Sequence, residues 1–409
     1  MNPRAEPPGI AERLATTARA LADIIVAHQR TLHRFPELAF EERRTSAWLA
    51  DTLRGLGLEP HTGLAGTGLA VELPGAGPGP TVMLRADMDG LPVREEPSHE
   101  PRSEHEDRMH ACGHDGHMAV ALGAAEAVVR VAGEGGTLPG RLVVLFQPAE
   151  ETGTGAARIV EEGVLDRLGV DYVLGLHLWS FAPRGQAIVP DGTVMASADE
   201  FRVAYSGRGG HGALPHEADD VVLALAHLVV ALQALVSREV DPVRPAVLSV
   251  GRIEAGSAPN VLPTRGELEG TFRAPDTDVR GHLLHRVGEL ARSIAAAHGV
   301  EAEVSFGAGI PPTVNHPGPA RLLRAAAAAV LGPDNVRDGP PTMAAEDFGL
   351  FLRERPGAFM LLGMRDEAAG VVAPHHHPDF RVAPGALAEG CEILLRAAVA
   401  LMESRADGG

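Results

Sequence analysis

The spacing of apolar and polar positions predicts an α/β arrangement for the first half of the chain. Apolar residues recur at helical intervals over 10–56, interrupted by a turn at 33–36. Short apolar runs predict strands at 68–73, 81–85, 141–146 and 172–176, with helices at 119–131 and 156–163. Continuous apolar runs such as 141–146 are typical of strands buried on both faces. This alternation favours a mixed, mostly parallel sheet covered by helices.

The pattern changes near Met195. Strands are predicted at 201–206, 246–253, 265–273 and 301–306, and helices at 221–237 and 282–298. The order strand-helix-strand-strand-helix-strand is typical of a ferredoxin-like α+β sandwich. After Pro311-Pro312 the chain returns to a helix at 320–331, a strand at 358–363 and a helix at 387–404. We therefore predict a larger α/β domain formed by 1–196 and 313–409, with an inserted domain at 197–312.

Composition excludes several classes of function. The 409 residues carry 36 basic and 54 acidic side chains, and every basic one is arginine. Without lysine there is no Schiff-base chemistry and no phosphate-loop lysine. The net charge of −18 argues against nucleic acid as a partner. Two cysteines cannot form a disulfide framework, and residues 1–20 lack the apolar core of a secretory signal, so we expect a cytoplasmic protein without a membrane span.

Side chains that can hold metal ions follow the predicted strands. Carboxyl ends of parallel strands meet at one edge of a sheet, where sites form in open α/β folds. The candidates are Asp87 and Asp89 after 81–85, Glu150 and Glu151 after 141–146, His177 after 172–176, His375 to His377 after 358–363, and Cys112 and His114 in the loop before 119–131. Thiolate, imidazole and carboxylate are metal-ligating groups, so this set predicts a metal site.

Each of these signals has a plain structural alternative. Cys112 could be an inert buried thiol, and His177 a hydrogen-bonded core histidine. Asp87 and Asp89 could cap a turn, or could orient histidine ligands by hydrogen bonds. The glutamate pair could belong to a solvated loop, although its place after a buried strand disfavours this.

The inserted domain contains a second group of candidates. The glycine-rich run Gly207–Gly212 lacks the strand-to-helix context of a nucleotide site, and its glycines would let the backbone approach a ligand beside His211. Asn260 and Arg273 could hold a substrate carboxylate. For Arg273, a surface salt bridge is an equally good interpretation.

Several motifs together resemble the two-metal amidohydrolases that include aminoacylases, hippurate hydrolase, auxin-conjugate hydrolases and glutamate carboxypeptidases. The resemblance is to the subgroup with a cysteine ligand, and it covers nearly the whole chain. The motifs are His33-Arg34-Phe35-Pro36-Glu37-Leu38, Arg85-Ala86-Asp87-Met88-Asp89-Gly90-Leu91-Pro92, Met109-His110-Ala111-Cys112-Gly113-His114-Asp115, Gln147-Pro148-Ala149-Glu150-Glu151, Gly210-His211 with Pro215-His216, Ala258-Pro259-Asn260-Val261-Leu262-Pro263, and Glu346-Asp347-Phe348.

The resemblance implies a role for each matching residue. The metal ligands would be Cys112, His114, Glu151, His177 and His376, the last chosen over His375 and His377 because it lies two residues before Pro378. Glu150 would be the general base, and Asp89 is placed with the catalytic residues. His211 and Asn260 would contact the transition state and substrate across a dimer. Ala344-Ala345 replaces the family's usual glycine before Glu346, so the backbone there is expected to differ.

The resulting hypothesis is hydrolysis of the amide bond of N-acyl amino acids by water activated at two divalent ions, which could be Zn, Mn, Co or Ni. The inserted domain would act as a lid with hinges near Met195 and Pro311, and would join subunits into a homodimer or homotetramer. Carboxypeptidase or dipeptidase activity by the same chemistry is an alternative. Two others are a cysteine hydrolase in which His114 activates Cys112, and a non-catalytic metal or peptide carrier.

Overall fold

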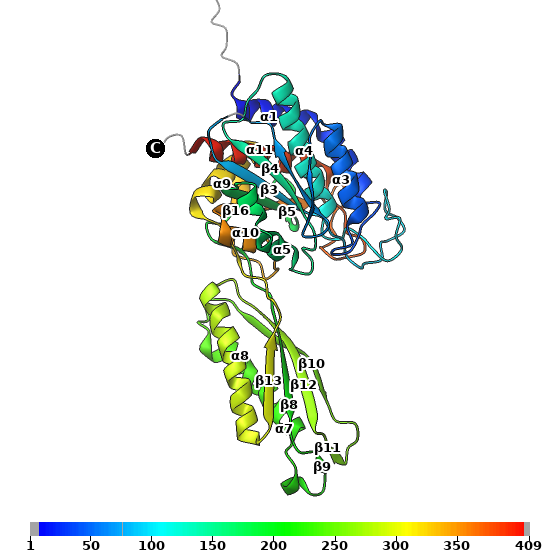
Figure 1. Cartoon of the computed structure of the whole chain (residues 1–409), viewed down its shortest axis with the longest axis vertical. Helices are drawn as coiled ribbons and strands as arrows, with labels where there is room; N and C mark the ends of the chain where they lie inside the picture. The colour runs from blue at the N-terminus through cyan, green and yellow to red at the C-terminus, as the bar shows by residue number, and fades with distance from the viewer. Residues whose placement is uncertain (1–7, 76, 405–409) are drawn as a thin grey trace, which may run out of the picture. The chain divides into compact units, whose positions relative to one another are not determined.

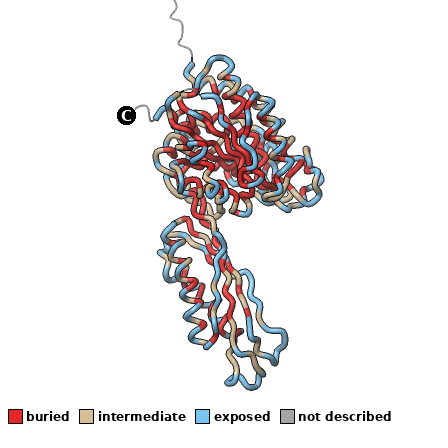
Figure 2. Tube along the Cα trace, in the orientation of Figure 1, coloured by how far each residue is buried: buried red, intermediate tan, exposed pale blue. Residues whose placement is uncertain are grey.

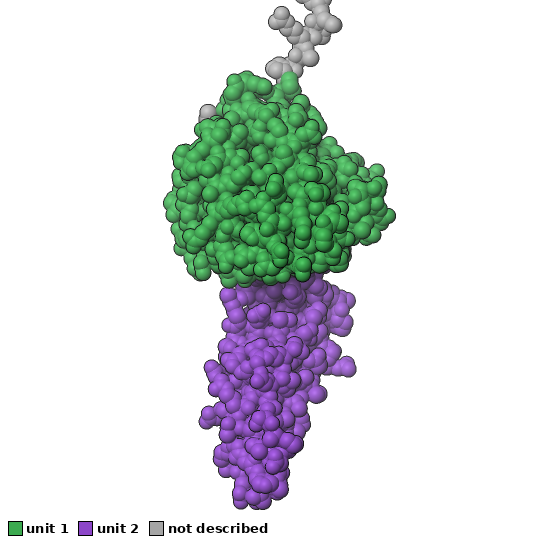
Figure 3. Space-filling model, turned by 90° about the vertical axis from the view of Figure 1, so that its right-hand side faces the viewer, with its two compact units in different colours: residues 1–194, 314–340, 347–409 green, residues 195–313, 341–346 purple. Residues whose placement is uncertain are grey.

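The computed structural model describes residues 8–75 and 77–404, which form two compact units (Figure 3). Unit 1 comprises 1–194, 314–340 and 347–409, and unit 2 comprises 195–313 and 341–346. The sequence analysis placed the inserted domain at 197–312; the structure adds the separate segment 341–346 to it. The ends of the predicted outer domain, 1–7 and 405–409, lie outside the described residues.

Unit 1 is built on a mixed eight-stranded sheet. Its order is β1 (His61–Leu64), β2 (Gly68–Leu73), β4 (Arg141–Gln147), β3 (Thr81–Asp87), β5 (Tyr172–Pro183), β16 (Gly357–Arg365), β6 (Ala187–Ile188) and β15 (Val336–Arg337). The four central strands β4, β3, β5 and β16 are parallel, whereas β1, β2 and the β16–β6 pair are antiparallel. The predicted mixed, mostly parallel sheet is confirmed.

Helices enclose this sheet (Figure 1). They are α1 (Ile10–Ala20), α2 (Ala22–Leu32), α3 (Arg43–Gly55), α4 (His114–Gly133), α5 (Gly155–Glu161), α6 (Val164–Arg167), α9 (Pro317–Leu331), α10 (Gly349–Glu354) and α11 (Pro384–Ser404). Two of them, α4 and α11, pack against each other and against β3 and β5. Figure 2 shows the resulting buried centre, in which the strands are covered almost throughout.

Two elements near the predicted site differ from expectation. Helix α4 begins at His114, whereas the sequence analysis left Cys112 to His117 in a loop, because the regular apolar pattern begins only after His117. Strand β5 was predicted to end before His177 but continues to Pro183. The extension contains polar and aromatic residues, so a search for continuous apolar runs does not detect it.

Unit 2 has a four-stranded antiparallel sheet in the order β10 (Val247–Ala255), β12 (Arg265–Arg273), β8 (Asp199–Ser206) and β13 (Glu301–Phe306). Helices α7 (Val221–Ala234) and α8 (Thr277–His298) pack on it around a core that includes Tyr205 and Phe272. Chain order and strand order together are those of the predicted ferredoxin-like sandwich. Short elements complete the chain: β7 (Thr193–Met195), β9 (Gly210–His211), η1 (Pro215–Glu217), η2 (Leu235–Glu239), β11 (Val261–Leu262), β14 (Thr313–Val314) and η3 (Pro333–Asn335).

The helical stretch Val221–Glu239 is long and apolar enough to cross a membrane, judged by length and composition alone, although the sequence analysis expected no such segment. One helix of this kind is weak evidence, because core helices pass the same test. Here Val221, Leu225, Leu228 and Leu232 are buried in the core of unit 2, whereas Val222, Leu223 and Val230 are exposed.

Candidate metal centre

Consecutive strand ends of unit 1 supply most of the predicted site. Asp87 is the last residue of β3, and Asp89 follows two residues later. Glu150 and Glu151 come shortly after β4, and His177 lies within β5. Because β3 is parallel to both β4 and β5, the carboxyl ends of the three strands lie at one edge of the sheet.

A thiol and two imidazoles form the buried part of the cluster. Gly113, at φ 94°, turns the chain from Cys112 into helix α4, whose first residue is His114. Glycine adopts this left-handed backbone at little cost. Sγ of Cys112 lies 3.4 Å from Nε2 of His177. Ligand atoms of these two residues and of His114 all lie within 4.8 Å of one another.

The adjacent glutamates and one C-terminal histidine extend the cluster. Nε2 of His114 lies 3.8 Å from Oε2 of Glu150 and 3.8 Å from Oε1 of Glu151. Nε2 of His376 lies 3.6 Å from the same oxygen of Glu151. Cys112, Glu151 and His376 also offer ligand atoms within 4.8 Å of one another. The structure therefore brings the five predicted ligands and Glu150 together.

Within the histidine triplet, His376 places a ring nitrogen 3.6 Å from Glu151. Nε2 of His375 instead accepts a hydrogen bond of 3.1 Å from the backbone N–H of Ser180. Nδ1 of His377 accepts a backbone hydrogen bond from two residues further along the chain. These contacts favour the choice of His376 that the resemblance implied.

Two residues of the cluster's loops hold a left-handed backbone although they are not glycine. Ala149, which precedes Glu150, has φ 54°, and His376 has φ 65°. Such conformations cost about 1–3 kcal/mol and persist where their surroundings impose them. Here the Ala149 N–H donates to Oε1 of Glu42 at 2.9 Å, and the His376 N–H donates to the Ala111 carbonyl at 2.8 Å.

Asp89 holds the loop that carries the glutamates. Its two carboxylate oxygens each accept a backbone N–H at 3.0 Å, one from Glu150 and one from Glu151. The Asp89 carbonyl lies 2.9 Å from Nδ1 of His114. A proton on Nδ1 leaves Nε2 of His114 as a lone-pair donor facing the cluster.

His117 is a site residue to which the sequence analysis gave no role. Its Nδ1 lies 2.7 Å from Oδ1 of Asp87, and its Nε2 accepts the Leu178 N–H at 2.9 Å. Arg85 also donates to Asp87, at 2.6 Å. The sequence did contain a clue to this role, because His114 and His117 are three residues apart. In a helix that begins at His114, this spacing puts both side chains on one face of α4.

A buried ion pair anchors this edge to the C-terminal part of unit 1. Nη2 of Arg85 lies 2.8 Å from Oδ1 of Asp347. Gln147 connects the two, accepting from Nε of Arg85 at 2.7 Å and donating to Asp347 at 2.9 Å. The motif Glu346-Asp347-Phe348 is thereby tied to the end of β3.

A second buried network lies beside the cluster. Nδ1 of His33 is 2.8 Å from Oδ2 of Asp115, and its Nε2 is 2.7 Å from Oε1 of Glu95. The same oxygen of Glu95 is 2.6 Å from Nδ1 of His99, whose Nε2 lies 3.2 Å from Asp379. The network thus joins the turn after α2, the start of α4, the loop 92–108 and the loop that carries His376.

Burial and neighbouring charges shift the pKa values of several residues in the cluster. Burial lowers the pKa of His114, but the carboxylates of Asp87 and Asp89 outweigh it and raise that pKa to about 10. Burial raises the pKa of the Glu151 carboxyl to about 7. Burial also holds the pKa of His177 well below its ordinary value, which favours the neutral imidazole that binds metals.

These residues fit divalent metal ions. Nε2 of His114 and Oε1 of Glu151 are buried and have no hydrogen-bond partner within the described part of the chain. The carboxylates of Asp87, Asp89 and Glu151 raise the pKa of His114, and a divalent cation would neutralise this gathered negative charge. A thiolate combined with imidazoles and carboxylates is a donor set for borderline transition metals.

Two predicted substrate contacts lie together in unit 2. β9, which contains His211, pairs with β11, and Val261 is the partner of His211. The Gly212 N–H donates to the Asn260 carbonyl at 2.9 Å. His211 and Asn260 line one cavity of about 710 Å³.

Arg273 lies elsewhere in unit 2. Arg265, at the opposite end of the nine-residue strand β12, lines the cavity with His211, so Arg273 is roughly 26 Å away along the strand. Nη1 of Arg273 donates to the Met343 carbonyl at 2.9 Å. The structure does not bring Arg273 together with His211 and Asn260.

Known proteins resemble the whole chain. Thermostable carboxypeptidase 1 of Saccharolobus solfataricus is 36% identical over 377 residues, which cover 91% of this chain and 94% of that protein. N-acetyl-L-cysteine deacetylase of Bacillus subtilis is 37% identical over 381 residues, covering 93% and 88% respectively. The crystal structure of the Bacillus subtilis YXEP protein, described as a dinuclear metal binding peptidase of the M20 family, matches with a TM-score of 0.81 at 30% identity, covering 94% of this chain and 99% of that one.

The family comparison agrees with the geometry. Residues 83–400 match the peptidase family M20/M25/M40. This range begins in β3, ends in α11 and contains every predicted metal ligand. From the clustered ligands, the shared fold and the matched length, the chain belongs to peptidase family M20/M25/M40 and is a metal-dependent hydrolase of amide bonds.

Proposed function

We propose that the protein hydrolyses N-acyl amino acids, releasing a carboxylic acid and a free amino acid. The observation that carries this proposal is the position of Glu150. Its carboxylate lies beside the predicted metal ligands but is not one of the five. A non-catalytic metal carrier has no use for such a group, whereas hydrolysis requires one that moves a proton. The N-acetyl-L-cysteine deacetylase relative supports an N-acyl amino acid as substrate.

Cys112, His114, Glu151, His177 and His376 would hold two divalent ions, which could be Zn, Mn, Co or Ni. When bound, such ions polarise a carbonyl and lower the pKa of water toward neutrality. The chain contributes a fixed arrangement of donors, because Asp89 orients both His114 and the glutamate loop by hydrogen bonds.

Glu150 would carry the proton. Its carboxylate accepts a proton from the attacking water as the new C–O bond forms at the substrate carbonyl. It then delivers that proton to the amide nitrogen as the C–N bond breaks, so the amine leaves neutral. Asp89 is proposed as the positioning residue, since it fixes the backbone N–H of Glu150 at 3.0 Å.

Unit 2 of a second copy of the chain would supply the remaining contacts across a dimer. We propose that His211 donates a hydrogen bond to the developing oxyanion and that Asn260 holds the substrate carboxylate, because the two line one cavity. Arg273 is a weaker candidate for that carboxylate, because it lies far along β12 and already donates to Met343. Unit 2 is also proposed as the lid and as the surface of a homodimer or homotetramer, which light scattering of the purified protein would test.

The test combines a substrate panel with metal analysis. Purified protein is assayed on N-acetyl and N-benzoyl amino acids before and after chelation, with metal added back, and on dipeptides to test the carboxypeptidase alternative. Glu150→Gln should retain bound metal while kcat falls roughly 10²–10⁴-fold. The control Glu161→Gln, on the surface at the end of α5, should retain full activity. Normal turnover by Glu150→Gln would exclude its role as base.

The contact between Cys112 and a histidine allows a second mechanism, that of a cysteine hydrolase, to be tested. For a cysteine hydrolase the sequence analysis expected His114 to activate Cys112, whereas Sγ of Cys112 lies 3.4 Å from Nε2 of His177, so His177 would take that role. That mechanism predicts activity insensitive to chelator and a covalent acyl-thiol detectable by mass spectrometry. Loss of activity on chelation, with recovery on metal addition and no acyl adduct, would eliminate it.

A further inference from the structure

One cavity of unit 1, of about 500 Å³, is lined by three arginines, and we call it the arginine cavity. Arg43 and Arg54 belong to α3 and Arg158 to α5, and no described residue of the lining is acidic. The lining contains none of the predicted metal ligands. In a chain with a net charge of −18, three guanidinium groups around one cavity create a local positive potential that attracts anions.

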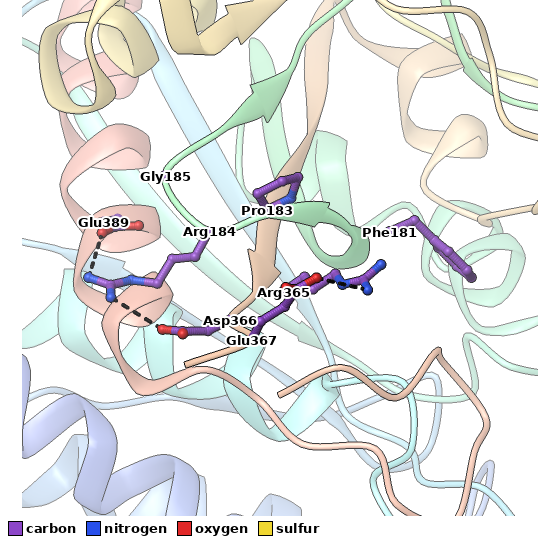
Figure 4. A pocket seen from close by; sticks show the side chains of 8 residues that line it. All are labelled: Phe181, Pro183, Arg184, Gly185, Arg365, Asp366, Glu367 and Glu389. Carbon is purple, nitrogen blue, oxygen red and sulfur yellow. Dashed lines mark hydrogen bonds and ion pairs between the residues drawn. The ribbon is translucent and has the colours of Figure 1, made fainter. Parts of the chain in front are cut away.

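Arginines at another cavity of unit 1 are neutralised by carboxylates of the same lining. In Figure 4, Arg184 reaches Glu389 at 3.2 Å and Asp366 at 3.6 Å. Arg365, which lines the same cavity, pairs with Glu367 at 3.1 Å. Three carboxylates thus face two guanidinium groups, so that cavity offers an anion no uncompensated positive charge.

The arginine cavity differs, because two of its arginines have no carboxylate partner within the part of the chain that the structure describes. These are Arg43 and Arg158, which are both exposed. Arg54 is paired, with Asp51 at 3.0 Å and with Glu59 at 3.6 Å. The uncompensated positive charge therefore belongs to Arg43 and Arg158, where a dissolved anion can reach it.

An aromatic contact positions the guanidinium group of Arg158. Its Cζ lies 3.8 Å from the centroid of the Phe40 ring, and both residues line the cavity. This cation–π contact occupies one face of the planar guanidinium. The N–H groups point outward in the plane of the group, so they are left to form hydrogen bonds with a bound anion.

The charge and the donors of the arginine cavity suit a phosphate group. A phosphate carries about two negative charges near pH 7 and three acceptor oxygens, so it can engage two guanidinium groups at once. A carboxylate, with one charge and two oxygens, matches only one of them. Glu162 does not line the cavity, although its carboxylate accepts the N–H of the lining residue Ala65 at 3.0 Å. The volume of about 500 Å³ lies in the range of small-molecule sites.

From these observations we propose that the arginine cavity binds a small phosphate-bearing anion, with Arg43 and Arg158 as its main ligands. This site does not depend on the proposed hydrolysis. An anion held by both arginines would connect α3 to α5, two elements that are far apart in the sequence.

The arginine cavity is also connected to the loop that carries the glutamates. Oγ1 of Thr67, a lining residue, donates to Oε2 of Glu42 at 2.5 Å. Oε1 of Glu42 accepts the Ala149 N–H at 2.9 Å, and Ala149 immediately precedes Glu150. Because α5 follows this loop, an anion that connects α3 to α5 should slow the hydrogen exchange of backbone amides in 149–158.

The experiment measures binding of inorganic phosphate to the metal-loaded protein by isothermal titration calorimetry, with sodium chloride at equal ionic strength as reference. Arg43→Gln and Arg158→Gln should each weaken binding about tenfold or more, as expected for loss of a charged hydrogen-bond donor. Arg158→Lys keeps the charge but not the planar fork, and its affinity should lie between those of Arg158→Gln and the wild type. The matched control Arg30→Gln removes an exposed arginine from the last turn of α2 and should bind like the wild type.

Weaker binding in both glutamine variants, with the metal content of the wild type, supports the proposal. Equal affinity in the wild type and both variants would assign phosphate to the metal ions or to another surface, and would overturn it. Hydrogen exchange gives the location independently. Slower exchange in 40–67 and 149–158 supports the site, whereas slowing only in other segments contradicts it.

A second titration, with adenosine monophosphate, distinguishes two sources of the phosphate group. Tighter binding than that of inorganic phosphate, with the same dependence on Arg43 and Arg158, supports the site and identifies an organic phosphate ester as its ligand. Equal or weaker binding with that dependence supports the site and identifies free phosphate. A wild type that binds neither compound beyond the chloride reference would overturn the proposal.

Discussion

The buried imidazole of His33 should make stability depend on pH. Burial lowers the pKa of His33, but the hydrogen bonds that His33 donates to the carboxylates of Asp115 and Glu95 outweigh it and raise that pKa to about 10, against 6.5 for the free group. This difference corresponds to roughly 5 kcal/mol in favour of the imidazolium in the folded state. Because the folded-state pKa is the higher one, the stabilisation is complete below about pH 6.5 and is lost as pH rises toward 10.

The contribution of His33 to stability can be measured by comparing the free energies of unfolding of the wild type and of a His33 variant. Between pH 7 and pH 9 the His33 contribution should fall by about 2–3 kcal/mol. Urea unfolding of chelated wild-type protein and of His33→Gln at both pH values measures the contribution of His33 together with its carboxylate partners Asp115 and Glu95, whose pKa values His33 lowers. The wild type should lose that much more stability than the variant. Control His61→Gln, which removes an exposed imidazole on β1, should shift the free energy of unfolding by less than about 0.5 kcal/mol at either pH. Parallel pH dependence in wild type and His33→Gln would refute the assignment of a charged, buried His33.

Three further substitutions test other parts of unit 1. Cys112→Ser replaces a soft sulfur ligand, so bound metal measured by mass spectrometry should fall below that of the wild type while folding is retained. Asp347→Ala removes one of the two carboxylates that pair with the buried Arg85, and urea unfolding should show a loss of roughly 3 kcal/mol. Gly175→Ala would put a Cβ 2.9 Å from the ring of Phe348 inside the sheet, and should cost about 1–3 kcal/mol in the same assay.

Controls for these variants use the same chain. Gly281→Ala in α8 meets no atom within 4 Å and should stabilise unit 2 by up to about 1 kcal/mol, in contrast to Gly175→Ala. Cys391→Ser changes the other cysteine, which is buried in α11, and should not alter metal content. Equal metal loss in both cysteine variants would contradict a ligand role for Cys112, and an unchanged urea midpoint in Asp347→Ala would contradict the importance of its pair with Arg85.

The sequence by itself determined the layered α/β fold and the order of elements in the inserted domain. Apolar periodicity is a local property, so β2, β12 and β13 have the bounds that the pattern predicted. The candidate ligands could be found because the carboxyl ends of parallel strands meet at one edge, whatever their distance along the chain. The resemblance then assigned roles to individual residues that spacing alone left open.

Only the tertiary structure decided the features that depend on contacts between distant segments. The starts and ends of α4 and β5 near the site are set by the turn at Gly113 and by packing of polar and aromatic residues, which carry no apolar period. His117 acquires its role from Asp87, and His33 from Glu95 and Asp115, across separations that no local pattern encodes. The rings of Phe181 and His375 likewise lie 5.7 Å apart because β5 and the loop after β16 meet at the same sheet edge.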